Sequence, residues 1–161
     1  MSIDPGITSR IATNDDRERI QALVFSVLQE FGLQGDPEGT DRDLNDIEGN
    51  YTNRGGIFEV IEDAAGNLLG TIGLYPVDAE TVELRKMYFA GELRGKGYGQ
   101  KTVAGAIANA REMGFKKIYL ETASVLQAAI HIYEKFGFKP SGTKRTPRCD
   151  QPYVLILNDE S

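Results

Sequence analysis

The sequence has few of the residues that mark several common classes of protein. It contains one cysteine, Cys149, one histidine, His131, and no tryptophan. A single cysteine cannot form an internal disulfide, so nothing in the chain requires an oxidising compartment. We expect no metal cofactor.

Long apolar runs and an excess of basic residues are also missing. No run of about 18 apolar residues is present, which argues against a membrane-spanning helix. The first ten residues lack the apolar core of a signal peptide. A net charge of −6 and a pI near 4.9 argue against nucleic acid as the main partner. We therefore expect a cytoplasmic protein without a membrane or nucleic-acid partner.

The remaining composition is that of a globular domain. The chain has 161 residues, of which 40% are apolar and 26% are charged, and both fractions are ordinary for folded proteins. This length suffices for one well-filled core. We predict a single domain over residues 1–161, with a frayed terminus at residues 1–6.

The most informative stretch runs from Thr81 to Gly114. Its beginning, Val82 to Phe89, has the β-branched and aromatic residues of a strand, and its end has apolar residues at helical spacing. Glycine-rich residues, Arg94 to Gly99, lie between the two. Glycines leave backbone N–H groups uncovered, and a helix N-terminus adds partial positive charge. The stretch therefore predicts a cradle for an anion, best suited to phosphate.

Two familiar phosphate loops do not fit this stretch. A P-loop has four residues between its first glycine and Gly-Lys-Ser/Thr. Here three residues separate Gly91 from Gly95, and Gly97 replaces the hydroxyl residue that would hold Mg²⁺. The dinucleotide fingerprint requires glycine at its sixth place, which counted from Gly95 is Gln100.

Two blocks of residues resemble the GNAT superfamily of acetyl-CoA-dependent N-acetyltransferases. Arg94 to Gly99 matches that family's Arg/Gln-x-x-Gly-x-Gly/Ala motif, and the preceding Leu84 to Phe89 looks like its fourth strand. Ala129 to Phe138 resembles the later motif that ends in Tyr-Glu-Lys-x-Gly-Phe. A strand-like Lys117 to Glu121 lies between the blocks. The resemblance extends over Ile57 to Leu157.

The element order agrees with that family's fold. We predict a mixed α/β (α+β) sheet, mostly antiparallel, with helices on both faces and a parallel crossover after the central helix. The resemblance implies that the fourth and fifth strands splay apart at a bulge. The predicted strands are Ile7 to Ala12, Ile57 to Glu62, Leu68 to Tyr75, Val82 to Phe89, Lys117 to Glu121, Phe138 to Lys144 and Tyr153 to Leu157. The predicted helices are one capped by Asn14 or Asp15 and ended by Gly32, a short one within Asp41 to Tyr51, Thr102 to Gly114, and Leu126 to Phe136.

The resemblance also assigns contacts to acetyl-CoA. The pantetheine arm would pair with the fourth strand as an added strand, and the glycine-rich turn would hold the pyrophosphate. Many relatives have an asparagine where this sequence has Leu126, so a side-chain contact there is in doubt and Ser124 is a substitute. The implied contact residues are Met87, Tyr88, Phe89, Arg94, Gly95, Lys96, Gly97, Tyr98, Gly99, Gln100 and Ser124.

Attack of an amine on a thioester needs a base and an acid. Tyr133 matches the tyrosine of the later motif and is the candidate acid for the departing thiolate, although packing alone would also explain an aromatic residue there. Glu83 is the candidate base, on the same strand face as Met87 if no bulge intervenes. Glu121 is a second candidate for the base.

Other reactive residues are given no role. His131 lies two positions before Tyr133, so on a helix the two side chains diverge by roughly 200°. Cys149 has no visible base partner, which argues against an acyl-enzyme. Arg145, Arg148 and Asp150 could meet a charged acceptor or face water, and we expect them to face water.

These features predict an acetyltransferase acting on a primary amine of a small molecule or peptide. Two alternatives stay open: a CoA-binding regulatory module without transfer, and an interaction domain with an empty cradle. The acceptor is not encoded in a readable motif. A homodimer is common among similar proteins, and the sequence leaves the oligomeric state open.

Overall fold

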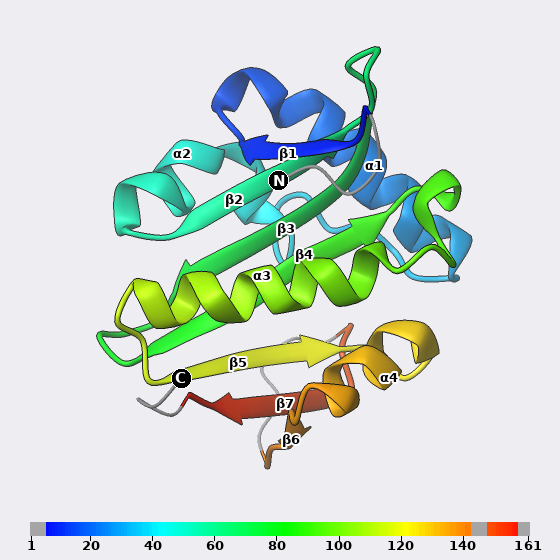
Figure 1. Ribbon diagram of the computed structural model, residues 1–161. Helices are drawn as coiled ribbons and strands as arrows, with labels where there is room; N and C mark the ends of the chain where they lie inside the picture. Colours follow the sequence, from blue (N-terminus) through cyan, green and yellow to red (C-terminus); the bar gives the residue numbers. More distant parts are fainter. Residues whose placement is uncertain (1–5, 143–147, 158–161) are drawn as a thin grey trace.

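The fold, described for residues 6–142 and 148–157 of a computed structural model, is built around one mixed sheet (Figure 1). Its seven strands lie in the order β1-β2-β3-β4-β5-β7-β6. Neighbouring strands are antiparallel except β4 and β5, which are parallel because α3 crosses over between them. The strands are β1 (Thr8–Ile11), β2 (Ile57–Glu62), β3 (Leu68–Pro76), β4 (Thr81–Phe89), β5 (Lys117–Thr122), β6 (Lys139–Pro140) and β7 (Gln151–Ile156).

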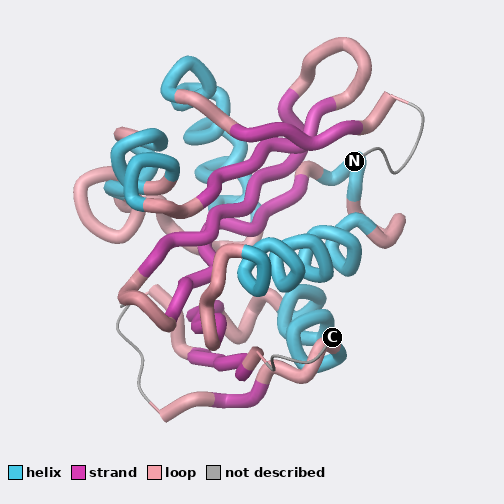
Figure 2. Tube along the Cα trace, turned by 60° about the vertical axis from the view of Figure 1, so that its left-hand side comes forward, coloured by secondary structure: helices cyan, strands magenta, loops and turns pink. Residues whose placement is uncertain are grey.

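Helices cover both faces of the sheet (Figure 2). The helices are α1 (Arg17–Glu30), α2 (Ile47–Asn50), α3 (Tyr98–Glu112) and α4 (Gln127–Lys135). Apolar residues of α3 and α4 pack with Val82, Leu84 and Ile118 on one face. Those of α1 and α2 pack with Phe58 and Val60 on the other. The predicted fold class is therefore confirmed.

The first helix begins differently from the prediction. The side chain of Thr13, not that of Asn14 or Asp15, is the cap: its oxygen accepts the Asp15 N–H at 3.2 Å. The Asp16 carboxylate accepts the Thr13 N–H at 2.9 Å, which completes a capping box. The reciprocal pair precedes a 3₁₀ turn, Asn14–Asp16, and α1 follows it. The predicted cap residues were therefore wrong.

Three other boundaries differ from the prediction. Helix α3 starts at Tyr98 and so includes the last part of the predicted turn. The region around Asp41–Tyr51 is divided between a 3₁₀ turn, Arg42–Asn45, and the single turn of α2. Strand β6 has 2 residues, and the rest of its predicted length, from residue 143, lies outside the described residues.

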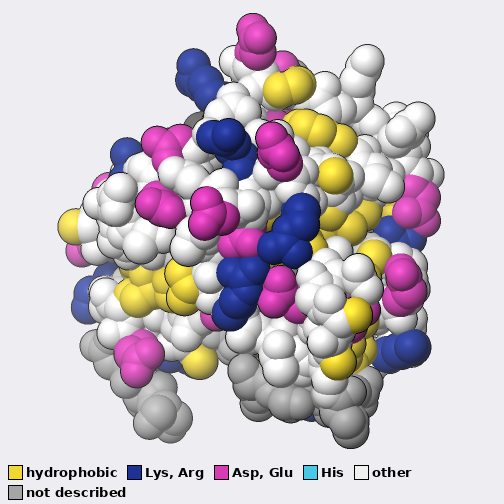
Figure 3. Space-filling model, turned by 90° about the horizontal axis from the view of Figure 1, so that it is seen from above, with side chains coloured by type: hydrophobic (Ala, Val, Ile, Leu, Met, Phe, Trp, Pro, Cys, Tyr) yellow, Lys and Arg dark blue, Asp and Glu magenta, His cyan; other side chains and the backbone are white. Residues whose placement is uncertain are grey.

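Charge is mixed on the face of the molecule seen from the β1 side (Figure 3). Arg10 and Arg19 there pair with the buried Asp16, at 2.7 and 2.6 Å. On this face, Figure 3 shows basic side chains interleaved with acidic ones. Along the described ranges, no helix has both the length and the apolar character needed to cross a bilayer.

Candidate active site

Strands β4 and β5 separate soon after they begin. Their pairing covers only Thr81 to Glu83 of β4, matched with Lys117 to Tyr119 of β5. Both strands continue beyond this point without pairing to each other, and they diverge in Figure 1. The expected splay is confirmed, and it leaves unpaired backbone groups along the end of β4.

A bulge in β4 lies at the start of the splay. Lys86 has a φ of 56°, a left-handed conformation that non-glycine residues rarely adopt. The pairing with β3 shifts there, since Arg85 faces Gly73 while Tyr88 faces Thr71. The Thr71 hydroxyl donates to the Lys86 carbonyl at 2.7 Å and so supports the distorted backbone.

The bulge changes which face each side chain occupies. Met87 packs with the apolar cluster under α3, whereas Tyr88 packs with the cluster under α1. Glu83 and Lys86 line a pocket together with Tyr88. Glu83 and Met87 therefore lie on opposite faces. The two were expected to share a face only if no bulge intervened, and a bulge does intervene.

An apolar cleft of about 670 Å³ opens between the end of β4 and the starts of α3 and α4. Its walls also include Val27 of α1 and Phe31, the residue that follows this helix. Nine of the predicted contact residues line it: Met87, Tyr88, Phe89, Arg94, Gly95, Gly97, Tyr98, Gly99 and Gln100. The structure thus gathers most of the predicted contact set around one cleft.

The glycine-rich turn has the geometry of an anion cradle. Gly95 and Gly97 have φ values of 75° and 88°, and Gly97 is the left-handed N-cap of α3. A Cβ at either glycine would meet no atom within 4 Å. Within the described ranges, the N–H groups of Gly95, Lys96, Gly97 and Gly99 have no hydrogen-bond acceptor. These donors face no competing group of the described chain, which suits an oxyanion.

The Arg94 side chain binds other parts of the chain. Its Nε and Nη2 atoms donate to the Phe89 carbonyl at 3.0 and 2.8 Å. The same guanidinium pairs with Glu30, where Nη2 lies 2.9 Å from Oε1. The side chain therefore fastens the turn to β4 and α1, and only other parts of Arg94 remain for a ligand in the cleft.

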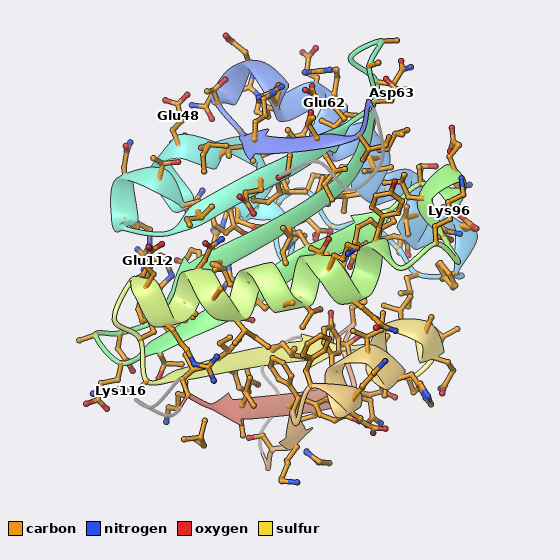
Figure 4. All side chains as sticks on the ribbon, in the orientation of Figure 1. Glu48, Glu62, Asp63, Lys96, Glu112 and Lys116 are labelled. Atoms are coloured by element: carbon orange, nitrogen blue, oxygen red, sulfur yellow. The ribbon has the colours of Figure 1, made fainter. Side chains whose placement is uncertain are left out.

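Two predicted contact residues do not line the cleft. Lys96 projects outward from the turn before α3 (Figure 4). The Ser124 hydroxyl donates to Asp150 at 2.9 Å, and its N–H donates to the same carboxylate at 2.8 Å. Leu126 and Gln127 line the cleft instead. The geometry therefore gives no support to a ligand contact by Ser124.

Tyr133 lies in the core between α4 and the sheet. It is buried, and its ring packs against Phe138 with centroids 5.6 Å apart. Burial raises the pKa of its hydroxyl above the usual value, so the phenol stays protonated at neutral pH. The neighbouring Ile132 lines the cleft, whereas Tyr133 itself does not.

The other two reactive residues border the cavities. His131 is exposed on α4 and lies at the wall of the apolar cleft. Cys149 lies in a second pocket, on the opposite face of the sheet, where burial raises the pKa of its thiol. A protonated thiol is a poor nucleophile, which agrees with the absence of a predicted role.

This second pocket, which we call the polar pocket, has a volume of about 390 Å³. Tyr88 lines both cavities, so the two spaces meet at that residue. The pocket's walls are Gly39, Thr40, Arg42, Asp43, Asn50, Tyr75, Glu83, Arg85, Lys86, Tyr88, Glu121, Arg148 and Cys149. Both candidate bases, Glu83 and Glu121, thus line the polar pocket.

A buried ionic network forms the floor of the polar pocket. Lys86 Nζ lies 3.3 Å from Asp41 and 3.1 Å from Asp43, and all three side chains are nearly inaccessible to solvent. Arg148 binds Asp41 through two bonds of 2.8 Å, so the expectation that Arg148 faces water was wrong. The Tyr51 hydroxyl donates to Asp43. These ion pairs could not be predicted from the sequence, because the paired residues are separated by up to 107 positions.

The network predicts a large loss of stability when Asp41 is neutralised. Burial alone would raise the pKa of Asp41, but the Arg148 hydrogen bond and the Lys86 charge hold it below its usual value. Asp41→Asn would leave the buried cations Lys86 and Arg148 short of an anion. The free energy of unfolding should therefore fall by about 3 kcal/mol. Chemical denaturation should show it, with Asp36→Asn, on an exposed turn, as the control. An unchanged denaturation midpoint for Asp41→Asn would contradict the prediction.

Comparison with known proteins agrees with this geometry. A model of the Acetyltransferase (GNAT) family matches residues 22–138. The chain therefore belongs to the GNAT family of N-acetyltransferases and is an acyltransferase. An uncharacterized N-acetyltransferase of Escherichia coli K12, YjgM, is 37% identical over 135 residues, which span 81% of this chain and 80% of that protein.

Solved structures show the same fold. A GNAT-family acetyltransferase from Staphylococcus aureus Mu50 superposes with a TM-score of 0.88 at 26% identity, over 94% of this chain and 99% of that one. The spermidine N-acetyltransferase of Vibrio cholerae, solved with CoA and spermine, has a TM-score of 0.70 at 22% identity, over 94% and 96% of the two chains. The second likeness concerns the fold alone.

Proposed function

We propose that this protein transfers an acetyl group from acetyl-CoA to a primary amine of a small molecule or peptide. The observation that carries the proposal is the position of the glycine cradle at the outer end of the wedge between β4 and β5. A diphosphate and an extended amide-bearing arm would find their partners along one continuous cleft. CoA in a neighbour of the same fold supports this choice of ligand.

The residues of the cleft fit such a ligand. Met87, Tyr88 and Phe89 lie where β4 no longer pairs with β5. Those of their backbone groups that are not already bonded to β3 or to Arg94 would bond the amides of the pantetheine arm. N–H groups from Gly95 to Gly99 would bind the pyrophosphate, with the positive end of α3 behind them. Acetyl-CoA supplies an activated acyl group as a thioester.

The polar pocket is suited to the acceptor amine. It meets the cleft at Tyr88 and carries the carboxylates of Glu83 and Glu121. An ammonium must lose a proton before it can attack a carbonyl. Glu83 would accept this proton as the base, directly or through a water molecule. Glu121 is the alternative base. The N–H of Met87 or Tyr88 would stabilise the negative charge that develops on the carbonyl oxygen.

Tyr133 would return a proton to the sulfur. Its raised pKa keeps the donor form present at neutral pH, and a thiolate leaves more readily when it is protonated.

Binding and turnover can be measured separately. We expect calorimetry to show one acetyl-CoA bound per chain, and thiol release when amino acids, polyamines, aminoglycosides or peptides are added. Binding without thiol release on any amine would favour a CoA-binding regulatory module. Failure of well-folded protein to bind CoA or acetyl-CoA would overturn the proposal, and native mass spectrometry would show whether a CoA species co-purifies.

A further inference from the structure

The cations of the polar pocket differ in how many of their N–H donors already bind other groups of the protein. Lys86 is 6% exposed and lies between Asp41 and Asp43. Arg148 is 12% exposed and uses both terminal nitrogens on Asp41 and the Gln34 carbonyl. These two cations hold the pocket together, and they have few exposed donors left for a ligand.

Arg85 differs from these two because it is both fixed in place and accessible. Its guanidinium stacks on the Tyr75 ring at 3.8 Å, Nη2 lies 2.9 Å from Glu83, and Nη1 lies 3.9 Å from Asp43. The side chain keeps 27% of its surface exposed and lines the pocket. A guanidinium has five N–H donors in a fixed plane, so this pairing leaves donors for a ligand. Such a fixed, planar cation is suited to a carboxylate.

The acidic groups lie next to this cation. Glu83 is its direct partner, and Glu121 on β5 lines the same pocket. A neighbouring carboxylate and guanidinium match a ligand whose ammonium and carboxylate are also neighbours, because each charge then meets its opposite. A polyamine would place a second ammonium beside Arg85 or the exposed Arg42 at the rim, where like charges repel.

We propose that the acceptor is a free α-amino acid and that Arg85 binds its carboxylate. The ammonium of the same molecule then lies at Glu83, where the proton must be removed. A volume of about 390 Å³ is at the small end for ligand pockets and suits a single amino acid. This inference rests on the proposed acetyl transfer and adds the class of acceptor to it.

The first test compares acceptors that differ only in the carboxylate. Each free amino acid of a panel is paired with its α-amide and with the amine that lacks the carboxylate group. We expect kcat/KM to be about 10- to 100-fold higher for the free acid, the range of one or two charge-assisted hydrogen bonds. Equal or higher values for the amide, the plain amine or spermidine would overturn the inference.

The second test removes the cation. Arg85→Gln should reduce the preference for acid over amide to about one, mainly through KM of the acid. The ratio is informative because any effect of the variant on Glu83 acts on both acceptors and cancels. Arg54→Gln is the matched control, since Arg54 also stacks on Tyr75, at 4.5 Å, but does not line the pocket. An unchanged preference in Arg85→Gln would exclude Arg85 as the carboxylate ligand.

The outcomes separate this inference from the proposed function. If acetyl-CoA binds and amines without a carboxylate are acetylated best, the transferase stands and the amino-acid acceptor is wrong. If acetyl-CoA does not bind, the proposed function itself fails. Should Arg85→Gln not fold, the acid-to-amide ratio of the unmodified protein still decides the question.

Discussion

Replacing Gly97 by aspartate is expected to weaken CoA binding by roughly 10²- to 10⁴-fold while leaving the protein folded. Gly97 is the left-handed N-cap of α3, and a Cβ there meets no atom within 4 Å. Aspartate tolerates this backbone region better than most residues and is a favourable capping residue. Its carboxylate would take the same N–H groups that the pyrophosphate needs and would repel the phosphates.

Gly97→Asn separates the charge from the bulk of the new side chain. Asparagine has the same shape and also tolerates a left-handed φ, so it should weaken binding by only about tenfold. Calorimetry with CoA gives the dissociation constants, and thermal unfolding shows whether each variant is folded. If Gly97→Asp binds CoA as the unmodified protein does, the diphosphate is not held at this turn.

Tyr133→Phe is expected to lower kcat by about 10²- to 10⁴-fold, the usual worth of a positioned proton donor. The affinity for CoA and the thermal stability should change little, because only the hydroxyl is removed and the ring still packs on Phe138. Tyr153→Phe is the control: this buried hydroxyl donates to Glu134 at 2.9 Å and lines neither cavity.

The pH dependence gives an independent check on Tyr133. Burial raises the pKa of this phenol, so the protonated form that acts as the acid persists to higher pH than in free tyrosine. The rate should therefore rise with pH as the amine loses its proton and should show no fall from tyrosine ionisation up to about pH 10. A descending limb near neutral pH would point to a different acid.

Tyr88 is the residue to test if Tyr133 proves unnecessary. It lines both cavities, and burial raises the pKa of its hydroxyl in the same direction. Full turnover in Tyr133→Phe together with loss of turnover in Tyr88→Phe would move the donor role to Tyr88. The two variants thus give opposite results for the two assignments.

Local patterns in the sequence were sufficient for the strands, most helices and the cradle. The β-branched and aromatic residues of Val82 to Phe89 indicated β4, and the glycines of Arg94 to Gly99 indicated the turn before α3. These features depend on neighbours within a few positions, so a linear sequence contains them. The same holds for the two motif blocks from which the family was inferred.

Features that depend on distant contacts could not be predicted. The bulge at Lys86 is supported by Thr71 and by buried partners on another element, and it moves Glu83 to the opposite face from Met87. Arg148 could not be placed because its partner, Asp41, lies 107 positions earlier. The class of fold, the glycine-rich turn and the family could be inferred from local patterns in the chain. The chemistry of the polar pocket could not, because its charges are buried and paired only when remote segments pack together.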